Sequence, residues 1–276
     1  MVLVTLKPLA WVVQSLAPAN AEVQILLADG QSPHDYQLKP ADVSHINASS
    51  LLVWTGPGME PWLQQVAARL PAEKNLVLLP GSVDDDEEEH GHEHAASILT
   101  ATDVDRDAHV WLDPLAMRTL APVIAARLQR VYPGREADIS SRLAQFQKDM
   151  TAIDAEMSAK FAPVAARGFV VYHDGYSRLV QHYGLQQRAA VWHHESVPAG
   201  ARERAALLKL LNSGDVACLF YEPEHGRDVV NNWLGNAAKH VKMVELDPLG
   251  QNIRPDAGAY RIFLRTLSAQ MADCLR

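Results

Sequence analysis

The chain has 276 residues, of which 48% are hydrophobic, so it is long enough and apolar enough to build two globular cores. Its formal net charge of −8 argues against a nucleic-acid partner, which would need a basic face, and is compatible with a cation as ligand. No apolar run approaches the length of about 18 residues that predicts a membrane span, and we recognise no secretory signal at the N-terminus.

The first half of the chain alternates between strand-like and helix-like segments. Strands are predicted at residues 2–6, 23–27, 51–54 and 76–79. Helices are predicted at residues 8–16, 39–47, 61–70 and 114–131. Strands that alternate with helices indicate parallel βαβ units.

A long amphipathic helix is predicted from residue 135 to about residue 160. Its apolar positions recur at steps of three or four: Ile139, Leu143, Phe146, Met150, Ile153 and Met157. Because it lies between two α/β halves, we interpret it as a rigid connector, against the alternative of an ordinary surface helix of one domain. A rigid connector predicts small relative movements of the two halves when a ligand binds.

The second half repeats the alternation, without a repeat of the residues themselves. Strands are predicted at residues 168–171, 189–192, 217–221 and 242–246, and helices at residues 177–183, 201–211, 228–239 and 258–275. The predicted fold is therefore α/β, with two lobes of parallel sheet flanked by helices. Its parts are an N-terminal lobe (1–132), a connecting helix (133–161) and a C-terminal lobe (162–276).

Three histidines lie far apart in the chain, each beside an apolar run that has the character of a strand end. They are His34, His109 and His173. Open α/β folds place their ligands at the carboxyl ends of the strands. Three imidazoles that converge there would form a transition-metal site, and zinc is the metal that this donor set favours.

A carboxylate is the natural fourth ligand, because three neutral imidazoles leave the charge of the zinc ion uncompensated. Asp247 at the end of a predicted strand is the first candidate, Glu195 is the second, and a water molecule is the third option. The alternative role for Asp247 is to cap a turn. We also expect a nearby aspartate to orient a histidine ring, and the candidates are Asp35, Asp113 and Asp174.

Residues 84–94 form an acidic stretch that contains three further histidines, His90, His92 and His94. Such a tract attracts metal ions, and we interpret the three histidines as a secondary, weak metal site. The alternative is a solvated acidic loop without a role in metal binding.

The two cysteines, Cys218 and Cys274, are not part of a Cys-x-x-Cys motif. They fit either one structural disulfide or two buried free thiols. A disulfide between them would contribute roughly 4 kcal/mol to stability by the chain-entropy argument.

Several short motifs together resemble the zinc-specific solute-binding proteins of bacterial ABC importers, the ZnuA type. They span nearly the whole chain in the order of that family. They are Lys7-Pro8-Leu9, Pro33-His34-Asp35-Tyr36, His109-Val110-Trp111-Leu112-Asp113-Pro114, His173-Asp174-x-Tyr176, Glu222-Pro223 and Leu246-Asp247-Pro248-Leu249-Gly250.

The resemblance implies that two α/β lobes joined by one long helix hold Zn²⁺ in the cleft between them. It implies metal ligation by His34, His109 and His173, and a disulfide between Cys218 and Cys274. It implies a protein of the periplasm that delivers zinc to the membrane permease of an ABC importer, by binding and not by catalysis. We also expect a monomer.

The chain departs from the family pattern in two places. Some zinc-binding members have a glutamate directly before the first histidine, where this chain has Pro33, so that ligand is absent here. The acidic, histidine-rich loop is shortened to residues 84–94. A third histidine at position 173 favours zinc over manganese, for which relatives use two carboxylates.

Three other functions are compatible with the same residues. A zinc hydrolase would need a general base beside an open metal position, and Glu195 is the candidate for that base. A metal-binding adhesin of the same fold and a manganese or iron carrier are the other two.

Overall fold

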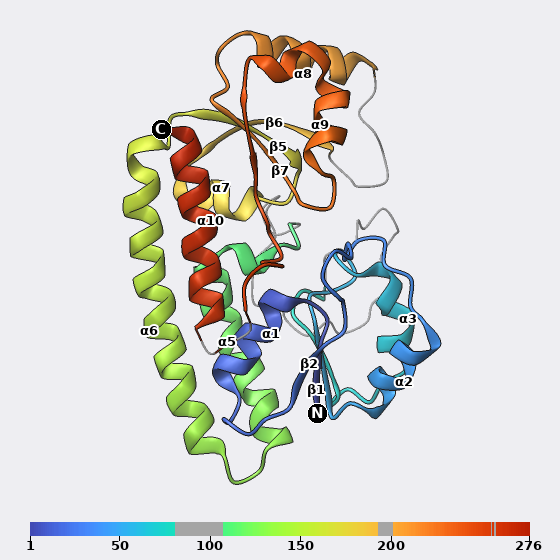
Figure 1. Cartoon of the computed structure of the whole chain (residues 1–276). Coiled ribbons are helices and arrows are strands. Elements are labelled where there is room, and N and C mark those ends of the chain that lie inside the picture. Colours follow the sequence, from blue (N-terminus) through green and yellow to red (C-terminus); the bar gives the residue numbers. More distant parts are fainter. Residues whose placement is uncertain (81–106, 193–200, 255, 257) are drawn as a thin grey trace, which may run out of the picture.

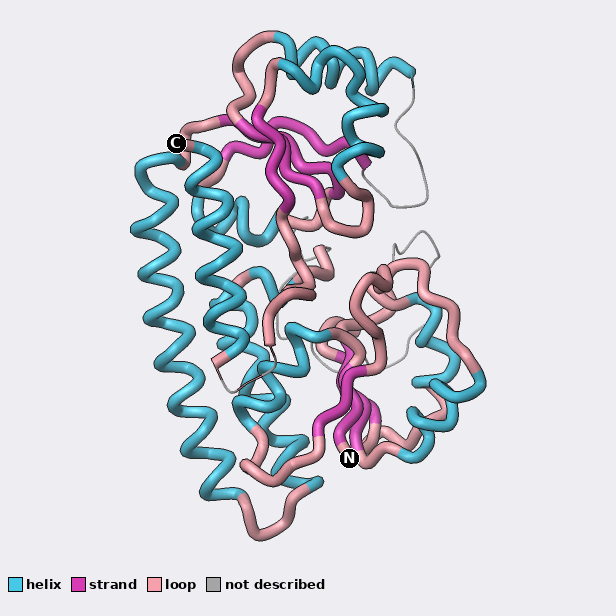
Figure 2. The backbone as a smooth tube through the Cα atoms, viewed as in Figure 1, coloured by secondary structure: helices cyan, strands magenta, loops and turns pink. Residues whose placement is uncertain are grey.

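Two four-stranded parallel sheets form the two lobes of the protein in the computed structural model, which describes residues 1–80, 107–192, 201–254, 256 and 258–276 (Figure 1). The strand order is β2-β1-β3-β4 in the first sheet and β6-β5-β7-β8 in the second. All six strand pairings are parallel, as the alternation of strands and helices predicts. Figure 2 shows helices on both faces of each sheet.

The first sheet consists of β1 (Val2–Val4), β2 (Val23–Ile25), β3 (Leu51–Trp54) and β4 (Asn75–Val77). Its helices are α1 (Lys7–Leu16), α2 (Pro40–Ala48), η1 (Pro61–Leu63), α3 (Gln64–Ala67), η2 (Val110–Leu112) and α5 (Pro114–Val131). The central strands β1 and β3 are buried at every position, because helices cover both of their faces.

The helix predicted at residues 61–70 is shorter and split into η1 and α3. The turn at its start is a 3₁₀ turn in which the Leu63 N–H bonds to the Glu60 carbonyl, and Pro61 has no N–H to contribute. At its end, the N–H groups of Arg69 and Leu70 bond to the carbonyls three residues before them, which is the 3₁₀ pattern, and the α-helix ends at Ala67.

The second sheet consists of β5 (Gly168–His173), β6 (Gln186–Trp192), β7 (Cys218–Tyr221) and β8 (Lys242–Glu245). Its helices are η3 (Ala162–Val164), α7 (Ser177–Tyr183), α8 (Ala201–Asn212), α9 (Arg227–Leu234), η4 (Gly235–Lys239) and α10 (Ala259–Leu275). Each of these matches a predicted element, with three differences: η3 was not predicted, β6 begins three residues before the predicted strand, and the last turns of the helix predicted at 228–239 are 3₁₀.

The connecting helix α6 (Glu136–Phe161) has 26 residues, which corresponds to about 39 Å. Five of the six predicted apolar positions are buried, and Leu143 is partly buried. Figure 1 shows α6 running beside α10 along both lobes. The boundaries of the predicted lobes stay a prediction.

The largest hydrophobic cluster contains side chains from both sheets and from the helices between them. It includes Val4 and Val53 of the first sheet, Met150 of α6, and Phe169 and Phe220 of the second sheet. The two lobes therefore share one continuous core, which opposes large movements of one lobe against the other because a close-packed core does not deform continuously. The small movement expected on ligand binding remains a prediction.

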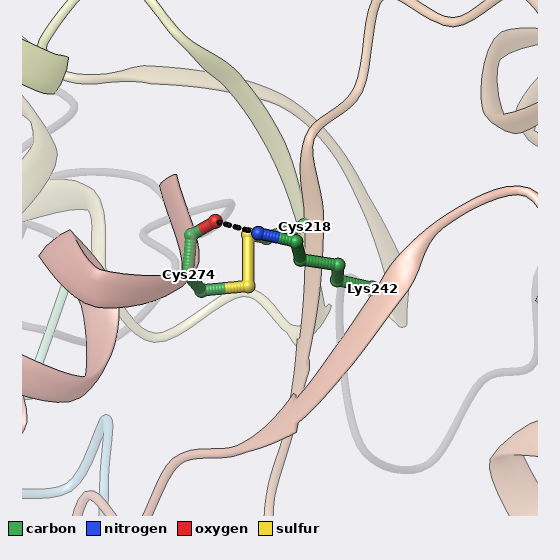
Figure 3. The surroundings of a disulfide bond; sticks show 3 residues. All are labelled: Cys218, Lys242 and Cys274. Carbon is green, nitrogen blue, oxygen red and sulfur yellow. Dashed lines mark hydrogen bonds between the residues drawn. A yellow bond between two sulfur atoms is a disulfide. The ribbon is translucent and has the colours of Figure 1, made fainter. Parts of the chain in front are cut away.

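A disulfide joins Cys218 at the start of β7 to Cys274 near the end of α10, as the resemblance implied (Figure 3). The two Cα atoms are 6.1 Å apart, a separation that a disulfide spans readily. Beside the bridge, Lys242 Nζ donates a hydrogen bond to the Cys274 carbonyl at 3.4 Å. The last helix is thus tied to the second sheet.

Among the helices within the described residues, none combines the length and the apolar character needed to cross a bilayer.

Candidate metal centre

His34, His109 and His173 meet between the two lobes. Each offers a ring nitrogen, and the three nitrogens lie within 4.8 Å of one another. The ring centroids are separated by 5.0 to 5.3 Å. His34 lies in the loop between β2 and α2, His109 lies directly before η2, and His173 is the last residue of β5. The predicted convergence of the three imidazoles is therefore present in the fold.

His34 contributes a ring nitrogen with no local partner. Its Nε2 is buried and has no hydrogen bond to any of the described residues. Burial lowers the pKa of His34, and the neighbouring His109 and His173 lower it further, well below the ordinary value of 6.5. The ring is therefore neutral near pH 7, which is the form that binds a metal ion. A buried, unpaired nitrogen is costly unless a ligand satisfies it.

The lowered pKa of His34 predicts how the stability of the zinc-free protein depends on pH. Below pH 6.5 the unfolded chain binds a proton at His34 that the folded chain does not bind, so stability falls as pH falls. Between pH 7 and pH 5.5 we expect wild type to lose about 1 kcal/mol more than His34→Gln. Urea unfolding of both proteins at each pH measures the difference. A difference that is constant with pH would contradict the neutral, buried state of His34.

His109 is oriented by Asp107. The Nδ1 atom of His109 lies 2.7 Å from Asp107 Oδ1, which also accepts the His109 backbone N–H at 2.9 Å. Burial acts to raise the pKa of the Asp107 carboxyl, but the charge and hydrogen bonds of His109 outweigh it and lower that pKa. The carboxylate therefore holds the proton of the ring on Nδ1 and leaves Nε2 for a metal ion.

Gly175 packs against the ring of His109. A Cβ atom built on Gly175 would lie 2.9 Å from both Cε1 and Nε2 of His109. The absence of a side chain at position 175 thus gives the His109 ring the space that it occupies.

His173 is oriented by Glu222, the residue that follows β7. Its Nδ1 atom lies 3.3 Å from Glu222 Oε1, and the Tyr176 hydroxyl donates to the same oxygen at 3.4 Å. The other oxygen of Glu222 lies 3.6 Å from His225 Nε2. Burial raises the pKa of Glu222, but the charge and hydrogen bond of His173, the hydrogen bond of His225 and the charge of His109 outweigh it and lower the pKa to about 2. A buried carboxylate therefore keeps its negative charge directly beside the three imidazoles.

Sequence reasoning missed both Asp107 and Glu222 as partners of the histidines. Asp107 could have been found from its Asp-x-His spacing, since it lies two residues from His109, whereas Asp113, which was considered, lies four residues away. Glu222 had no local signal, because it is 49 residues from His173. Of the aspartates considered, Asp113 instead pairs with His182 at 2.8 Å, and Asp35 is exposed.

The carboxylate of Asp247, the first candidate for a fourth ligand, caps a turn. Its oxygens accept the backbone N–H groups of Leu249, Gly250 and Gln251 at 3.0, 2.8 and 2.6 Å. The group of converging side chains found among the described residues comprises the three histidines without Asp247. Ligation by Asp247 stays a prediction, and it would require these hydrogen bonds to rearrange.

The cavity at the three histidines is small, with a volume of about 20 Å³. Its lining residues are Ser32, Pro33, His34, His109, Trp111, His173, Glu222, Glu224, Pro248 and Leu249. Two carboxylates, those of Glu222 and Glu224, therefore face the histidines. The predicted secondary metal residues His90, His92 and His94, and the alternative ligand Glu195, lie outside the described residues.

Loss of the Glu222 charge is expected to weaken metal binding. We expect Glu222→Gln to lower zinc affinity about 10- to 100-fold, because the partners of ligating histidines contribute by that amount. Glu224→Gln is the matched control, since Glu224 is exposed at the same cavity. Chelator competition measures both affinities. An equal or larger loss for the Glu224 variant would assign the carboxylate role to Glu224 instead.

Known proteins resemble this chain over its whole length. A family model described as "Zinc-uptake complex component A periplasmic" matches residues 2–274. The high-affinity zinc uptake system protein ZnuA of Haemophilus ducreyi is 30% identical over 99% of this chain and 93% of that protein. ZnuA of Yersinia pestis is 29% identical over 100% of this chain and 91% of that protein. The structure of the periplasmic zinc binding protein TroA from Treponema pallidum matches with a TM-score of 0.79 at 20% identity, over 99% of this chain and 98% of that one, and so shares the fold.

Proposed function

The chain belongs to the family of periplasmic component A of zinc-uptake complexes, and from this premise we propose that it binds one Zn²⁺ ion and passes it to the membrane permease of an ABC importer. The ion is the cargo of the protein, and the chemistry is capture and release without turnover. We place the protein in the periplasm and expect it to act as a monomer.

The observation that carries the proposal is the convergence of three histidine nitrogens within 4.8 Å. We propose His34, His109 and His173 as the zinc ligands. Three imidazole nitrogens suit zinc better than manganese, magnesium or calcium, which prefer oxygen ligands. Two of the rings are already oriented by carboxylates, which raises their strength as ligands.

We propose that a carboxylate or a water molecule occupies the fourth coordination position of the ion. Asp247 is the carboxylate that we proposed from the sequence, and it would reach the ion by giving up backbone hydrogen bonds. Glu222 needs no such rearrangement to compensate the charge of the ion from beside His173. We propose that His90, His92 and His94 bind zinc weakly and apart from this site.

Zinc titration of the full chain in competition with a chromophoric chelator tests the proposal. We expect one tight site per chain that survives deletion of residues 84–94, and zinc binding that excess Mn²⁺ does not displace. Tight binding that disappears with the deletion would move the site to the acidic stretch. Displacement by Mn²⁺ would favour a manganese carrier.

Hydrolysis assays on the zinc-loaded chain separate transport from the hydrolase alternative. We expect no turnover of ester or phosphoester substrates above the rate of free Zn²⁺. Turnover that is lost together with zinc binding in His109→Ala would overturn the role of a carrier.

A further inference from the structure

Helix α7 belongs to the second lobe, but two of its side chains bond to the segment of the first lobe that carries His109. Arg178 Nε donates to the Asp107 carbonyl at 2.6 Å, and the Arg178 backbone N–H donates to Asp107 Oδ2 at 3.3 Å. One turn later on the same helix face, His182 Nδ1 lies 2.8 Å from Asp113 Oδ1. The helix therefore contacts the metal-binding segment at two points.

These two contacts lie on either side of His109. Asp107 bonds to the His109 ring through one carboxylate oxygen and to Arg178 through the other, so it links α7 directly to the ring. Asp113 is the N-cap of α5, where its side chain accepts the Leu115 N–H at 2.8 Å. Residues 107–113 are thus held at both ends.

His182 also reaches the connecting helix. Its Nε2 atom lies 2.9 Å from Asp154 Oδ1 of α6, and the Tyr183 hydroxyl donates to the same oxygen at 3.0 Å. One imidazole therefore joins the first lobe, the connecting helix and the second lobe. Any relative movement of these three parts would therefore have to change the contacts of α7.

Burial of Arg178 indicates that this arrangement has a role beyond stability. The residue is 4% exposed, and the Asp107 side chain that it contacts is 5% exposed. Burying a guanidinium group costs more than burying an apolar side chain of similar volume. We infer that this contact is kept because it fixes a geometry, as some buried polar contacts do.

The same helix begins close to His173. Ser177, its first residue, follows the third histidine by one short turn, in which the Gly175 N–H bonds to the His173 carbonyl at 3.0 Å. Helix α7 therefore begins shortly after His173, the last residue of β5, and holds the His109 segment along its face. His34 differs, since its loop is tied to the first lobe through the Trp62 Nε1 bond to the Pro33 carbonyl at 2.6 Å.

We propose that Arg178 and His182 are positioning residues of the zinc site, which rests on the zinc-binding function proposed above. Through them α7 fixes His109 at a set separation from His173. The incoming ion then meets His109 and His173 already held at this separation, with His34 beside them as the third nitrogen donor. Neither Arg178 nor His182 touches the ion.

The test compares four variants of the full chain: Arg178→Gln, Arg178→Lys, His182→Gln and Arg265→Gln. The last is the matched control. Arg265 of α10 makes a bidentate ion pair with Glu156 of α6 at 2.7 and 2.8 Å, and it lies outside the cavity lining. The readouts are zinc affinity by chelator competition, the visible spectrum of the Co²⁺-loaded protein, melting temperature, and amide hydrogen exchange of residues 107–115 without metal.

We expect Arg178→Gln and His182→Gln each to lower zinc affinity about 10- to 100-fold, the range found for residues that orient metal ligands. The intensity of the Co²⁺ bands should fall, exchange at residues 107–115 should rise, and Arg178→Lys should recover part of the affinity because it can still donate to the Asp107 carbonyl. Arg265→Gln should change melting temperature alone.

Two results would overturn the inference. The first is faster exchange at residues 107–115 with wild-type zinc affinity and an unchanged Co²⁺ spectrum, which would leave α7 a purely structural role. The second is unchanged exchange in every variant, which would show that α7 does not hold the segment. Exchange is measured without metal, so it tests whether α7 holds residues 107–115 independently of zinc binding. Failure of the wild-type chain to bind zinc would overturn the proposed function and not this contact.

Discussion

His109→Ala is expected to lower the zinc affinity of the full chain by about two to three orders of magnitude. Apparent zinc-binding free energies of about 10–16 kcal/mol in four-ligand sites correspond to roughly 2.5–4 kcal/mol for each ligand. The loss of His109 also leaves the Asp107 carboxylate, which is buried, without its ring partner. Chelator competition at pH 7.5 measures the affinity, and His34→Ala and His173→Ala should give losses of the same order.

His45→Ala is the matched control for these variants. His45 is exposed on α2 and lies outside the cavity lining, so its removal should leave zinc affinity unchanged. An affinity loss of less than about tenfold in all three site variants would mean that the tight site lies elsewhere in the chain. A loss of zinc affinity in one variant and not in the other two would show that the ion is held by a different set of ligands.

Removal of the disulfide is expected to have the largest effect on stability. The bridge closes a loop with a sequence separation of 56 residues. By the chain-entropy argument, such a loop stabilises the folded state by about 4 kcal/mol, which corresponds to a fall in melting temperature on the order of 10 °C. The double variant Cys218→Ala/Cys274→Ala is preferred to serine, because Cys218 is fully buried and a hydroxyl there would need a partner.

Zinc affinity separates this effect from damage to the site. Cys218 lies at the start of β7 and Glu222 follows its other end, so the bridge and the histidines are at opposite ends of the sheet. We therefore expect the double variant to bind zinc as tightly as wild type at a temperature where both are folded. An unchanged melting temperature would show that the reduced, unfolded chain gains little freedom from the open loop.

Local patterns were sufficient for the order and type of most elements. The stripe from Ile139 to Met157 predicted α6 within one residue at each end, since a 3.6-residue period is imposed by the helix itself. The helix predicted at residues 61–70 was the least accurate element. The apolar period continues there, but Pro61 and the return to bonds three residues back restrict the α-helix to Gln64–Ala67.

For the site, the sequence by itself singled out the three histidines that the fold brings together, by the expectation that each follows a strand. Only His173 ends a strand in the structure, since His34 lies in a loop after β2 and His109 directly precedes η2. The two cysteines alone fitted either a bridge or free thiols, the family resemblance implied the bridge, and the packing of α10 against β7 brings their Cα atoms to 6.1 Å. Only the tertiary structure decided which groups orient the rings. Glu222 and Arg178 act on residues 49 and 71 positions away, respectively, and such contacts depend on how the lobes pack, which no local pattern encodes.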